Sequence, residues 1–483
     1  MVNIRNLTDL EQQIKEDFTH LNIPKKSWMI PRNHLENEKN HIDVAIIGAG
    51  MSGLALSLAL YTEGINAIVF DQCKEGEEGP WKNTARMETL RSPKQAIGPA
   101  LSFPSLTFQA WFKAQFGQEH WELLDKIPRL QWHDYLQWFK KVTQPYILYE
   151  HNLIDLNVGE KGSTLYFKNL ANGEIQTYMS SHTILAMGID SFSSPNIPTF
   201  MNNVSNHRWE HAYHRSNYHK FKNLDIGVIG YSAGAMDSSA TALECGAKSV
   251  EILCRCKDFP RVNRGKVAFN SGYLNSYPYW SDQQKWDFNY YLKQERTPAP
   301  HGSTLRVSHH KNAYFNFDEH VVSVKEYQNK IHIQTKKHHF IFDYLILATG
   351  FSLNWSKYSW LSYIRDHTKQ WKDQYISNEL PDNSLSQAPY LTTNFEFIAK
   401  SKQLDSDFSR LYCFNYSASL SQGPLVGMIS GVEHGAPHLA KAISHKIYLD
   451  SFDQYINKVK HSEDFELEGN EWEVTLPYVT RQS

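Results

Sequence analysis

Three glycines near the N-terminus have the spacing that brings a main chain close to a phosphate. They follow a short apolar run, residues 43–47, and precede a helix-forming stretch, residues 54–61. The first glycine permits a tight turn, the second a close approach to a pyrophosphate, and the third helix-on-strand packing. The unpaired N–H groups of the helix N-terminus favour an anion. We therefore predict a dinucleotide site whose turn comprises Gly48, Gly50, Met51, Ser52 and Gly53.

An acidic residue closes this unit. A second β-branched run, residues 67–70, ends on Asp71, 23 positions after Gly48. A carboxylate there can accept both hydrogen bonds from a ribose diol, and we include its neighbour Gln72 in the predicted site. The alternative is a glycine-rich βαβ unit that binds nothing.

The order of strand, turn, helix and strand recurs in residues 225–255. The expected elements are a strand at 226–229, a turn from Gly230, a helix at 236–245 and a strand at 249–253. Two copies of one unit with different sequences suggest two nucleotides bound by two domains.

Side chains of the second unit indicate which nucleotide it binds. Ser232 and Ala233 lie in its turn, and Arg255 follows its second strand, where the first unit has an acid. A guanidinium there can pair bidentately with a ribose 2′-phosphate, with Lys257 as helper, which favours NADPH over NADH. The alternative is a solvated arginine at a strand end.

The second turn also has a competing interpretation. Residues 230–234 match GxSxG, the nucleophile elbow of serine hydrolases, with Ser232 as nucleophile and a later histidine such as His434 as base. An HGGG-type oxyanion segment is missing, and a hydrolase does not need the dinucleotide unit upstream. We therefore regard the hydrolase as the weaker hypothesis.

Composition narrows the remaining function classes. A chain of 483 residues predicts two or three domains, and a formal charge of −2 gives no reason to expect nucleic acid or an anionic membrane as partner. No apolar run has the length of a membrane span, and the N-terminus does not resemble a signal peptide. Five scattered cysteines suit a reducing cytoplasm.

Metal and disulfide chemistry are not expected. His434 and His438 have the spacing of helical metal ligands, but Pro437 lies between them, and a carboxylate and third ligand are lacking. Cys254 and Cys256 have the wrong spacing for a thioredoxin-like redox pair.

Four features in order resemble one family. These are the first glycine turn, Gly79-x-Trp81, the second turn at Gly230, and the triplet Ala348-Thr349-Gly350. Over residues 41–445 the chain resembles the class B flavin-dependent monooxygenases, in which FAD binds the first turn, NADPH binds the second, and threonine-glycine triplets link the domains. Two departures concern the second unit. Ser232 replaces the middle glycine, and of the family's Phe-x-Gly motif with a histidine three residues later, only His211 is present.

The resemblance implies an activity and its partners. NADPH would reduce FAD, and a flavin C4a-(hydro)peroxide would insert one atom of O2 into a small substrate by N-, S- or C-hydroxylation. Alternatives are an NAD(P)H-dependent flavin oxidoreductase or oxidase, and an aromatic or purine (urate-type) hydroxylase, since some bacterial relatives share the N-terminal arm and the ETLRSPK segment. The expected partners are the substrate, O2 and a second copy in a homodimer.

The resemblance also implies functional positions. Arg91, Asn415 and His211 are the candidate catalytic residues, although Arg91 could instead form a surface ion pair. Asn415 and the turn before Pro437 would close over the isoalloxazine, where a helix N-terminus favours reduced flavin. The further cofactor-binding positions are Trp81, Ser92, Gly188, Thr349, Gly350 and Pro437.

The predicted fold class is α/β, with two Rossmann-like dinucleotide-binding domains and an N-terminal helical arm. The FAD domain would be discontinuous and the NADP domain inserted into it. The predicted segments are the arm (1–40), the FAD domain (41–204 and 343–450), the NAD(P)H domain (205–342) and a C-terminal tail (451–483).

Overall fold

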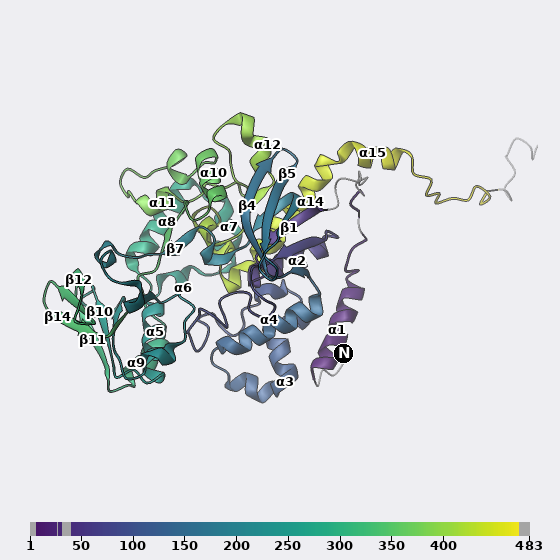
Figure 1. The fold of residues 1–483 in the computed structure, drawn as a ribbon. Coiled ribbons are helices and arrows are strands. Elements are labelled where there is room, and N and C mark those ends of the chain that lie inside the picture. The colour runs from purple at the N-terminus through teal and green to yellow at the C-terminus, as the bar shows by residue number, and fades with distance from the viewer. Residues whose placement is uncertain (1–5, 27, 31–39, 473–483) are drawn as a thin grey trace, which may run out of the picture.

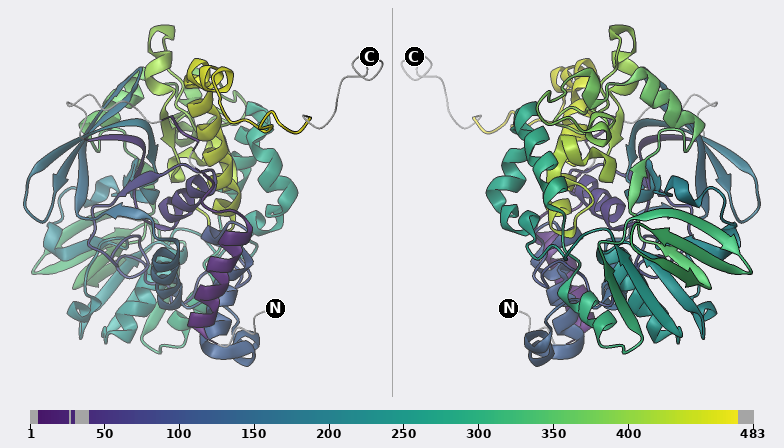
Figure 2. Two further views of the ribbon diagram at one scale, coloured as in Figure 1. Left: turned by 90° about the vertical axis from the view of Figure 1, so that its right-hand side faces the viewer. Right: turned by 90° about the vertical axis from the view of Figure 1, so that its left-hand side faces the viewer.

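The computed structural model describes residues 6–26, 28–30 and 40–472. Two α/β domains lie side by side, each with its own sheet (Figures 1 and 2). The predicted fold class is confirmed.

The first sheet has a parallel centre. β1 lies between β2 and β6, β3 extends the sheet beyond β2, and β17 pairs with the end of β6. β4 and β5 form an antiparallel flap that pairs with the first half of β6. The strands are β1 (His41–Ile47), β2 (Ala67–Phe70), β3 (Tyr146–Leu148), β4 (His151–Gly159), β5 (Gly162–Asn169), β6 (Ile175–Leu185) and β17 (Leu411–Cys413).

Two helices are layered on the first sheet: α2 (Met51–Thr62) packs against β1, and α14 (Ile429–Asp450) packs against α2. α2 is apolar on almost every face, because it is buried between the sheet and α14. A helix that is hydrophobic all round belongs in a core. Glycines let the chain before α14 approach it closely: a Cβ added at Gly431 or Gly435 would overlap main-chain carbonyl oxygens of residues 424 and 425.

The second domain contains a five-stranded parallel sheet in the order β11-β10-β9-β15-β8. A three-stranded antiparallel sheet, β12-β13-β14, lies beside it. The strands are β8 (Trp209–His211), β9 (Asp225–Ile229), β10 (Ser249–Cys254), β11 (Ala313–Phe317), β12 (Val321–Tyr327), β13 (Lys330–Thr335), β14 (His339–Phe342) and β15 (Tyr344–Leu347). The domain's helices are α5 (Ala233–Glu244) and α9 (His301–Ser308).

The domain limits differ from the predicted ones in two places. β15 pairs with β9 and β8, so the second sheet extends to Leu347, and the predicted return to the first domain at residue 343 is too early. The helical segment 264–295, predicted as part of the second domain, contacts the first: the Trp286 indole donates to the Leu380 carbonyl at 2.8 Å.

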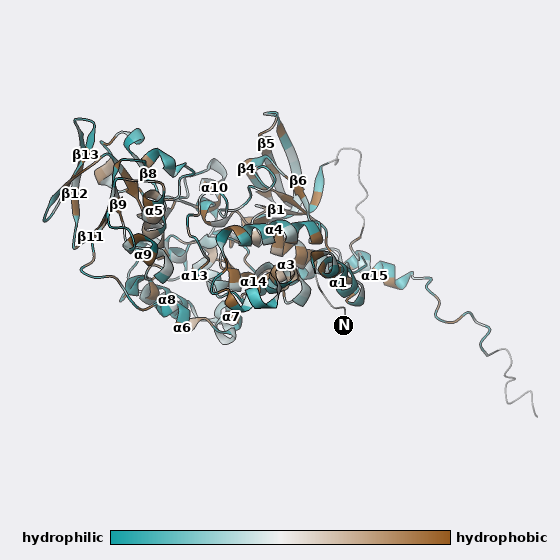
Figure 3. Cartoon of the chain, turned by 90° about the horizontal axis from the view of Figure 1, so that it is seen from below, coloured by the Kyte–Doolittle hydropathy of each residue, from teal (hydrophilic) through white to brown (hydrophobic). Residues whose placement is uncertain are grey.

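Most other helices belong to the first domain or to this segment. They are α3 (Phe108–Leu123, kinked at Gly117), α4 (Arg129–Thr143), α6 (Arg264–Ala268), α7 (Ser271–Ser276), α8 (Asp282–Glu295), α10 (Ser359–His367), α11 (Asn383–Ser386), α12 (Asp405–Phe408) and α13 (Ser419–Gln422). Hydrophobic residues concentrate along α5, β9 and α14, while α15 is mostly hydrophilic (Figure 3).

Two short strands carry the chain between the domains. β7 (Ser193–Pro195) and β16 (Phe351–Leu353) pair antiparallel where the chain leaves the first sheet and where it returns from the second. The two crossings therefore lie side by side.

Both ends of the chain carry helices. α1 (Leu7–His20) forms the predicted arm and packs on α3, while residues 31–39 lie outside the described residues. The predicted tail begins as a helix, α15 (Phe452–Lys460), and the chain after it extends away from the domains (Figure 1). No helix in the described part of the chain combines the length and apolarity needed to cross a membrane.

Candidate cofactor site and active site

The first glycine turn has the geometry that the sequence predicts. Gly48 has a φ of +109°, and a Cβ there would lie 2.7 Å from the carbonyl oxygen of Ala186. A Cβ at Gly53 would overlap the Gly48 carbonyl oxygen, so α2 can begin at this point only with glycine. Met51 and Ser52 form the first turn of α2, which contains no acidic side chain. The N-terminus of α2 is thus free to face an anion.

The acidic residue after β2 is buried and partly used by the protein. Asp71 accepts hydrogen bonds from the main-chain N–H groups of Ala49 at 2.7 Å and Cys73 at 2.8 Å. Burial raises the pKa of this carboxyl. The carboxylate therefore braces the glycine turn, and its remaining lone pairs are available to a ribose. Gln72 is exposed.

The tryptophan after this turn provides an independent test of whether FAD fits. Gly79 faces Gly50, with 3.9 Å between the Gly79 Cα and the position of a Cβ on Gly50. The Trp81 ring lies against Gly79, and its Nε1 is buried without a hydrogen-bond partner. This N–H group is available to an acceptor on a bound molecule. The glycine turn and the unpaired indole N–H thus fit a bound FAD.

The second turn repeats the first at the level of the main chain. Gly230 has a φ of +132°, and a Cβ there would overlap the carbonyl oxygen of Ala348. Ser232 is the N-cap residue of α5, and Ala233 is its first residue. The Ser232 side chain is exposed and makes no capping hydrogen bond. Since α5 also lacks an acid in its first turn, its N-terminus too can face an anion.

The same geometry contradicts the nucleophile elbow. Ser232 has φ −87° and ψ −170°, which is ordinary extended backbone rather than a strained turn. The candidate base, His434, lies within 3.1 Å of Glu433 on its own helix. The serine-hydrolase hypothesis is therefore abandoned.

Arg255 directly follows β10 and is exposed. It forms no ion pair with a described residue, and Lys257 is exposed two residues further on. Both cations are thus free to meet a phosphate.

The two small-residue triplets lie behind the turns. Gly188 follows β6 with a φ of +69°, and Gly350 follows β15 with a φ of +80°. The Thr349 hydroxyl donates to the main-chain oxygen of Asn196, and the Asn196 N–H donates to the Gly350 carbonyl at 2.9 Å. This triplet therefore joins the two crossings between the domains.

The segment after Trp81 runs between the domains. The Arg91 guanidinium donates to the Pro298 carbonyl of the second domain, so it forms a domain contact rather than the surface ion pair considered above. Burial lowers the pKa of Arg91, and the carboxylate of Asp237 opposes this shift. Ser92 is half-buried.

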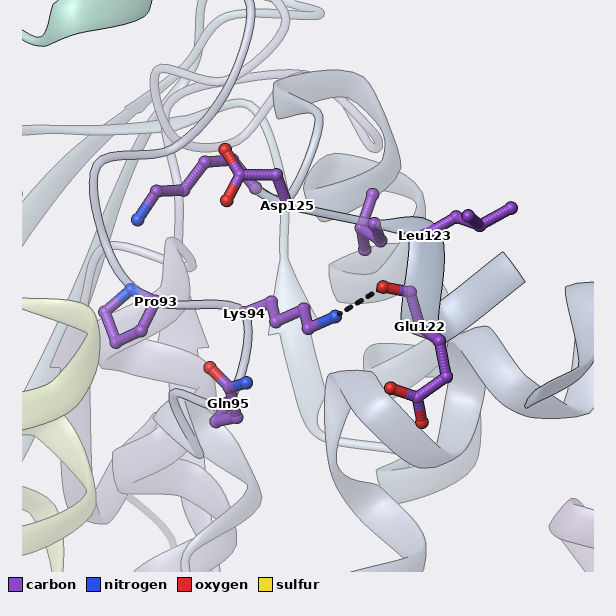
Figure 4. A pocket seen from close by; sticks show the side chains of 8 residues that line it. Pro93, Lys94, Gln95, Glu122, Leu123 and Asp125 are labelled. Carbon is purple, nitrogen blue, oxygen red and sulfur yellow. Dashed lines mark hydrogen bonds between the residues drawn. The ribbon is translucent and has the colours of Figure 1, made fainter. Parts of the chain in front are cut away.

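A polar cavity of about 440 Å³ adjoins this segment (Figure 4). It lies between residues 93–95 and residues 122–126, and the Lys94 ammonium reaches across it to the carbonyl oxygens of Trp121 and Glu122 at 2.7 and 3.5 Å. None of the glycines of either turn lines it. It is therefore separate from the predicted cofactor site.

Asn415 is buried directly after β17, and its amide is fully used within the protein. The Nδ2 group donates to the Leu185 carbonyl at 2.9 Å, and the Oδ1 atom accepts from the Ser417 N–H at 3.0 Å. The side chain thus fixes the loop after β17 to the end of β6 and supports the site rather than reacting in it.

The predicted position of Pro437 is wrong. α14 begins at Ile429, so Pro437 lies within the helix and not at its N-terminus. The N-terminal turn of α14 instead follows Gly427, and Gly431 and Gly435 let residues 424 and 425 approach it. The four-residue spacing of these two glycines was the sequence signal for this contact.

His211 lies at the end of β8, beside the start of β16, the second crossing. It is 2% exposed, its Nδ1 accepts from the Tyr213 N–H at 3.2 Å, and its ring packs edge-on against Phe351. Burial lowers its pKa to about 4, and the nearby His214 contributes. His211 is thus a neutral imidazole at neutral pH, placed at the domain junction.

Within the described residues, no group of three histidine, cysteine, aspartate or glutamate side chains is arranged to hold a metal. His438 Nε2 lies 3.0 Å from the Thr393 carbonyl, and Cys254 and Cys256 are not joined by a disulfide.

The sequence matches models of two protein families. Residues 45–189 match a family described as FAD-NAD(P)-binding, and residues 119–296 match L-lysine 6-monooxygenase/L-ornithine 5-monooxygenase. An FAD-dependent urate hydroxylase from Xanthomonas campestris pv. campestris is 29% identical over 92% of this chain and 94% of its own length.

Solved structures share the fold. The ornithine hydroxylase of Pseudomonas aeruginosa superposes with a TM-score of 0.65 at 14% identity, over 84% of this chain and 99% of that one. The cadaverine monooxygenase of Erwinia amylovora, solved with FAD, has a TM-score of 0.63 at 11% identity, over 84% and 95%. Together with two nucleotide turns that fit FAD and NAD(P)H, the sequence matches support an FAD-dependent NAD(P)H monooxygenase that is similar to the class B flavin-dependent monooxygenases.

Proposed function

We propose that this enzyme uses NADPH and O2 to hydroxylate a small purine of the urate type. The observation that carries the proposal is the likeness to the urate hydroxylase, which is 29% identical and extends through both nucleotide units and the helical segment 264–295. The structural neighbours named above are 11–14% identical and support the fold alone.

Two unpaired polar atoms are the candidate contacts for a purine substrate in this proposal. In the loop between β17 and α14, Gln422 is fully buried, and its Nε2 donates to the Thr392 carbonyl at 2.6 Å. Its Oε1 atom and the Ser417 hydroxyl have no hydrogen-bond partner among the described residues. Urate presents ring N–H donors and carbonyl acceptors, which such groups can bind. A site built to hydrogen-bond its substrate rejects analogues that lack those groups.

In this proposal the cofactor carries out the redox chemistry, and the protein positions FAD and NADPH. When bound, FAD would accept a hydride from NADPH and activate O2. The N-termini of α2 and α5 would hold the two pyrophosphates, Asp71 would contact a ribose, and Arg255 with Lys257 would hold the 2′-phosphate. Trp81 would contact the flavin side of FAD, and the loop after β17 would help exclude water.

The test measures NADPH oxidation, O2 uptake and product formation with the purified FAD-loaded enzyme. We expect urate to accelerate NADPH oxidation and the product to contain one labelled atom when ¹⁸O2 is supplied. A second arm uses Gln422→Leu, which should raise the KM for urate about tenfold, as expected for loss of a buried hydrogen bond. NADPH oxidation that yields hydrogen peroxide and no labelled product with any substrate would instead establish an oxidase.

A second candidate is N-hydroxylation of an amine. The match of residues 119–296 to the lysine and ornithine monooxygenase family favours it, because this stretch includes the helical segment 264–295. The same assay with L-ornithine, L-lysine and cadaverine decides between the two. Faster NADPH oxidation with one of these amines and none with urate would replace the purine proposal.

We also propose that the enzyme acts in the cytoplasm as a homodimer. For the cytoplasmic location, the support is that the five cysteines are all free, as expected in a reducing compartment. Leu449 at the end of α14, and Phe452 and Val459 of α15, are 57%, 47% and 71% exposed and offer apolar side chains that a second copy could cover. Light scattering during gel filtration should give twice the chain mass of 56.0 kDa, and Phe452→Ser with Val459→Ser should give the single mass.

A further inference from the structure

The two domains keep separate hydrophobic cores. One cluster joins residues of β1, α2, α4, β6 and α14, and another joins residues of β9, α5 and β10. Residues 212–224, which connect β8 and β9 of the second domain, are called the linker below. Near this linker the domains meet through polar groups, around a cavity of about 550 Å³ lined by Arg86 and Arg129 of the first domain and Tyr218 and Arg306 of the second. Polar interfaces between domains permit relative motion unless specific contacts prevent it.

A single guanidinium holds the linker at this place. Arg86 belongs to the loop after Trp81, and its Nη1 donates to the carbonyl oxygen of Ala212 at 2.7 Å. Its Nη2 donates to the carbonyls of His214 at 2.7 Å and Ser216 at 3.5 Å. Three carbonyls of the five-residue stretch 212–216 thus accept from one side chain.

Two contacts with the second domain hold Arg86 from its other sides. Its guanidinium carbon lies 4.1 Å from the centre of the Tyr218 ring, a cation–π contact. The Arg306 Nη1 group donates to the main-chain oxygen of Arg86 at 3.2 Å, and Arg306 is itself held by Glu244 at 2.7 Å. Both the side chain and the main chain of Arg86 are therefore tied to the second domain.

Only arginine can make this set of contacts. Its planar fork presents five N–H donors and stacks on aromatic rings, whereas lysine carries a compact ammonium on a flexible stem. A lysine here would keep the positive charge but could not bind three carbonyls while stacking on Tyr218.

We propose that Arg86 is a positioning residue that sets the nucleotide domain against the loop facing the flavin, and so fixes the distance between the nicotinamide and the flavin. Hydride transfer is sensitive to this distance, since a misplacement of about 1 Å can cost about 100-fold in rate. The cofactor assignment underlies the kinetic consequence, but the linker contacts exist without any cofactor.

The first experiment compares wild type with Arg86→Lys and with Glu77→Gln. Glu77→Gln is the matched control, because it removes the exposed Glu77–Arg215 ion pair of 3.2 Å between the same two regions. We expect Arg86→Lys to slow the reduction of flavin by NADPH about 30-fold or more, with the NADPH Kd and the FAD content changed less than about threefold. The control should stay within about twofold of wild type, as exposed ion pairs contribute little.

The second readout uses the protein without nicotinamide nucleotide. The linker contains Arg215 and Lys220, so its exposure can be followed by the rate of tryptic cleavage there. Arg86→Lys should raise this rate about tenfold, because it releases the three carbonyls, while Glu77→Gln should not. If the purine or the monooxygenase proposal fails but cleavage still rises, the role of Arg86 at the linker stands.

Two outcomes would overturn the proposal. One is flavin reduction in Arg86→Lys at the wild-type rate with the linker still protected. The other is a slower reduction explained entirely by lost FAD or NADPH binding, which would make Arg86 merely structural. If Arg86→Lys does not fold, Tyr218→Leu removes the stacked ring and leaves the three carbonyl contacts, and it should show the same pattern with a smaller change.

Discussion

The two nucleotide units share one main-chain design but differ in how tightly they are closed. In each, the first glycine has a positive φ and leaves no room for a Cβ against the small residue that starts the triplet behind it: Gly48 against Ala186, and Gly230 against Ala348. The third position differs. A Cβ at Gly53 would overlap the Gly48 carbonyl, whereas the second unit carries Ala235 at the matching place.

The residues that follow the second strand of each unit also differ in burial. Asp71 is buried and braces the first turn through Ala49, whereas Arg255 is exposed and has no ion-pair partner among the described residues. The first unit is thus packed around its ligand position, and the second leaves its charged side chain in solvent. This difference suits a cofactor that stays bound and a nucleotide that must enter and leave in each turnover.

We call the first unit closed, because its turn is packed around Gly53, and the second unit open. The largest expected effect comes from adding a methyl group to the turn of the closed unit. Gly53→Ala would place its Cβ against the Gly48 carbonyl, so the turn or α2 must shift. We expect a loss of about 3 kcal/mol in the free energy of unfolding and a colourless protein without FAD, measured by denaturation and visible absorbance. The matched change, Ala235→Gly, should cost only about 1 kcal/mol and leave the protein yellow. Equal losses in the two variants would refute the claimed difference between the units.

The junction between the units should give the second largest effect. Burial lowers the pKa of His211 from 6.5 to about 4, so the unfolded chain binds a proton below pH 6.5 that the folded chain does not. The contribution of His211 to the free energy of unfolding is therefore fully present above about pH 6.5. It is lost as the pH falls toward 4, by about 3 kcal/mol in all.

Denaturation of wild type and His211→Asn at pH 7.5, 5.5 and 4.5 measures this contribution. The difference between the two proteins in free energy of unfolding should shrink as the pH falls. A difference that does not depend on pH would show that His211 is not held neutral at the junction.

Loss of the exposed arginine in the open unit should have an intermediate effect. Arg255→Ala removes a charge-assisted hydrogen bond to the 2′-phosphate, which corresponds to about 10- to 100-fold weaker NADPH binding. The affinity for NADH, which lacks this phosphate, should stay unchanged, and so should the FAD content. Titration of the FAD-loaded enzyme with each nucleotide gives both values. Equal weakening of NADPH and NADH binding would place the 2′-phosphate elsewhere.

Local patterns predicted the two units well because both depend on short-range rules. The strand at residues 67–70 occurs with the predicted limits, and the strands predicted at 226–229 and 249–253 differ by one residue from the observed ones. An apolar run, a turn residue or a capping box such as Ser281 with Gln284 is encoded within a few neighbouring residues.

The errors arose where distant segments decide the structure. Proline was expected near a helix start, yet α14 continues through Pro437, because its neighbours in the helix, Ala436 and Leu439, are buried in the core of the first domain. The return to the first domain was expected at residue 343, but β15 joins a sheet whose other strands lie far away in the sequence. The partners of Arg86, at residues 212–216 and 306, likewise have no local signature.

The smallest expected effect concerns Ser232, which replaces the middle glycine of the second turn. Ser232 and Gly50 are both N-cap residues with extended backbone, at φ −87° and −66°, so serine needs no strained conformation there. Its exposed hydroxyl makes no capping bond. Ser232→Gly should therefore change the NADPH Kd by less than about threefold, the range of a surface substitution. The reciprocal change, Gly50→Ser, should weaken FAD binding about tenfold, because it adds a side chain where the main chain has to approach the pyrophosphate. A large gain in NADPH affinity from Ser232→Gly would mean that the open unit, too, has to be closed around its nucleotide.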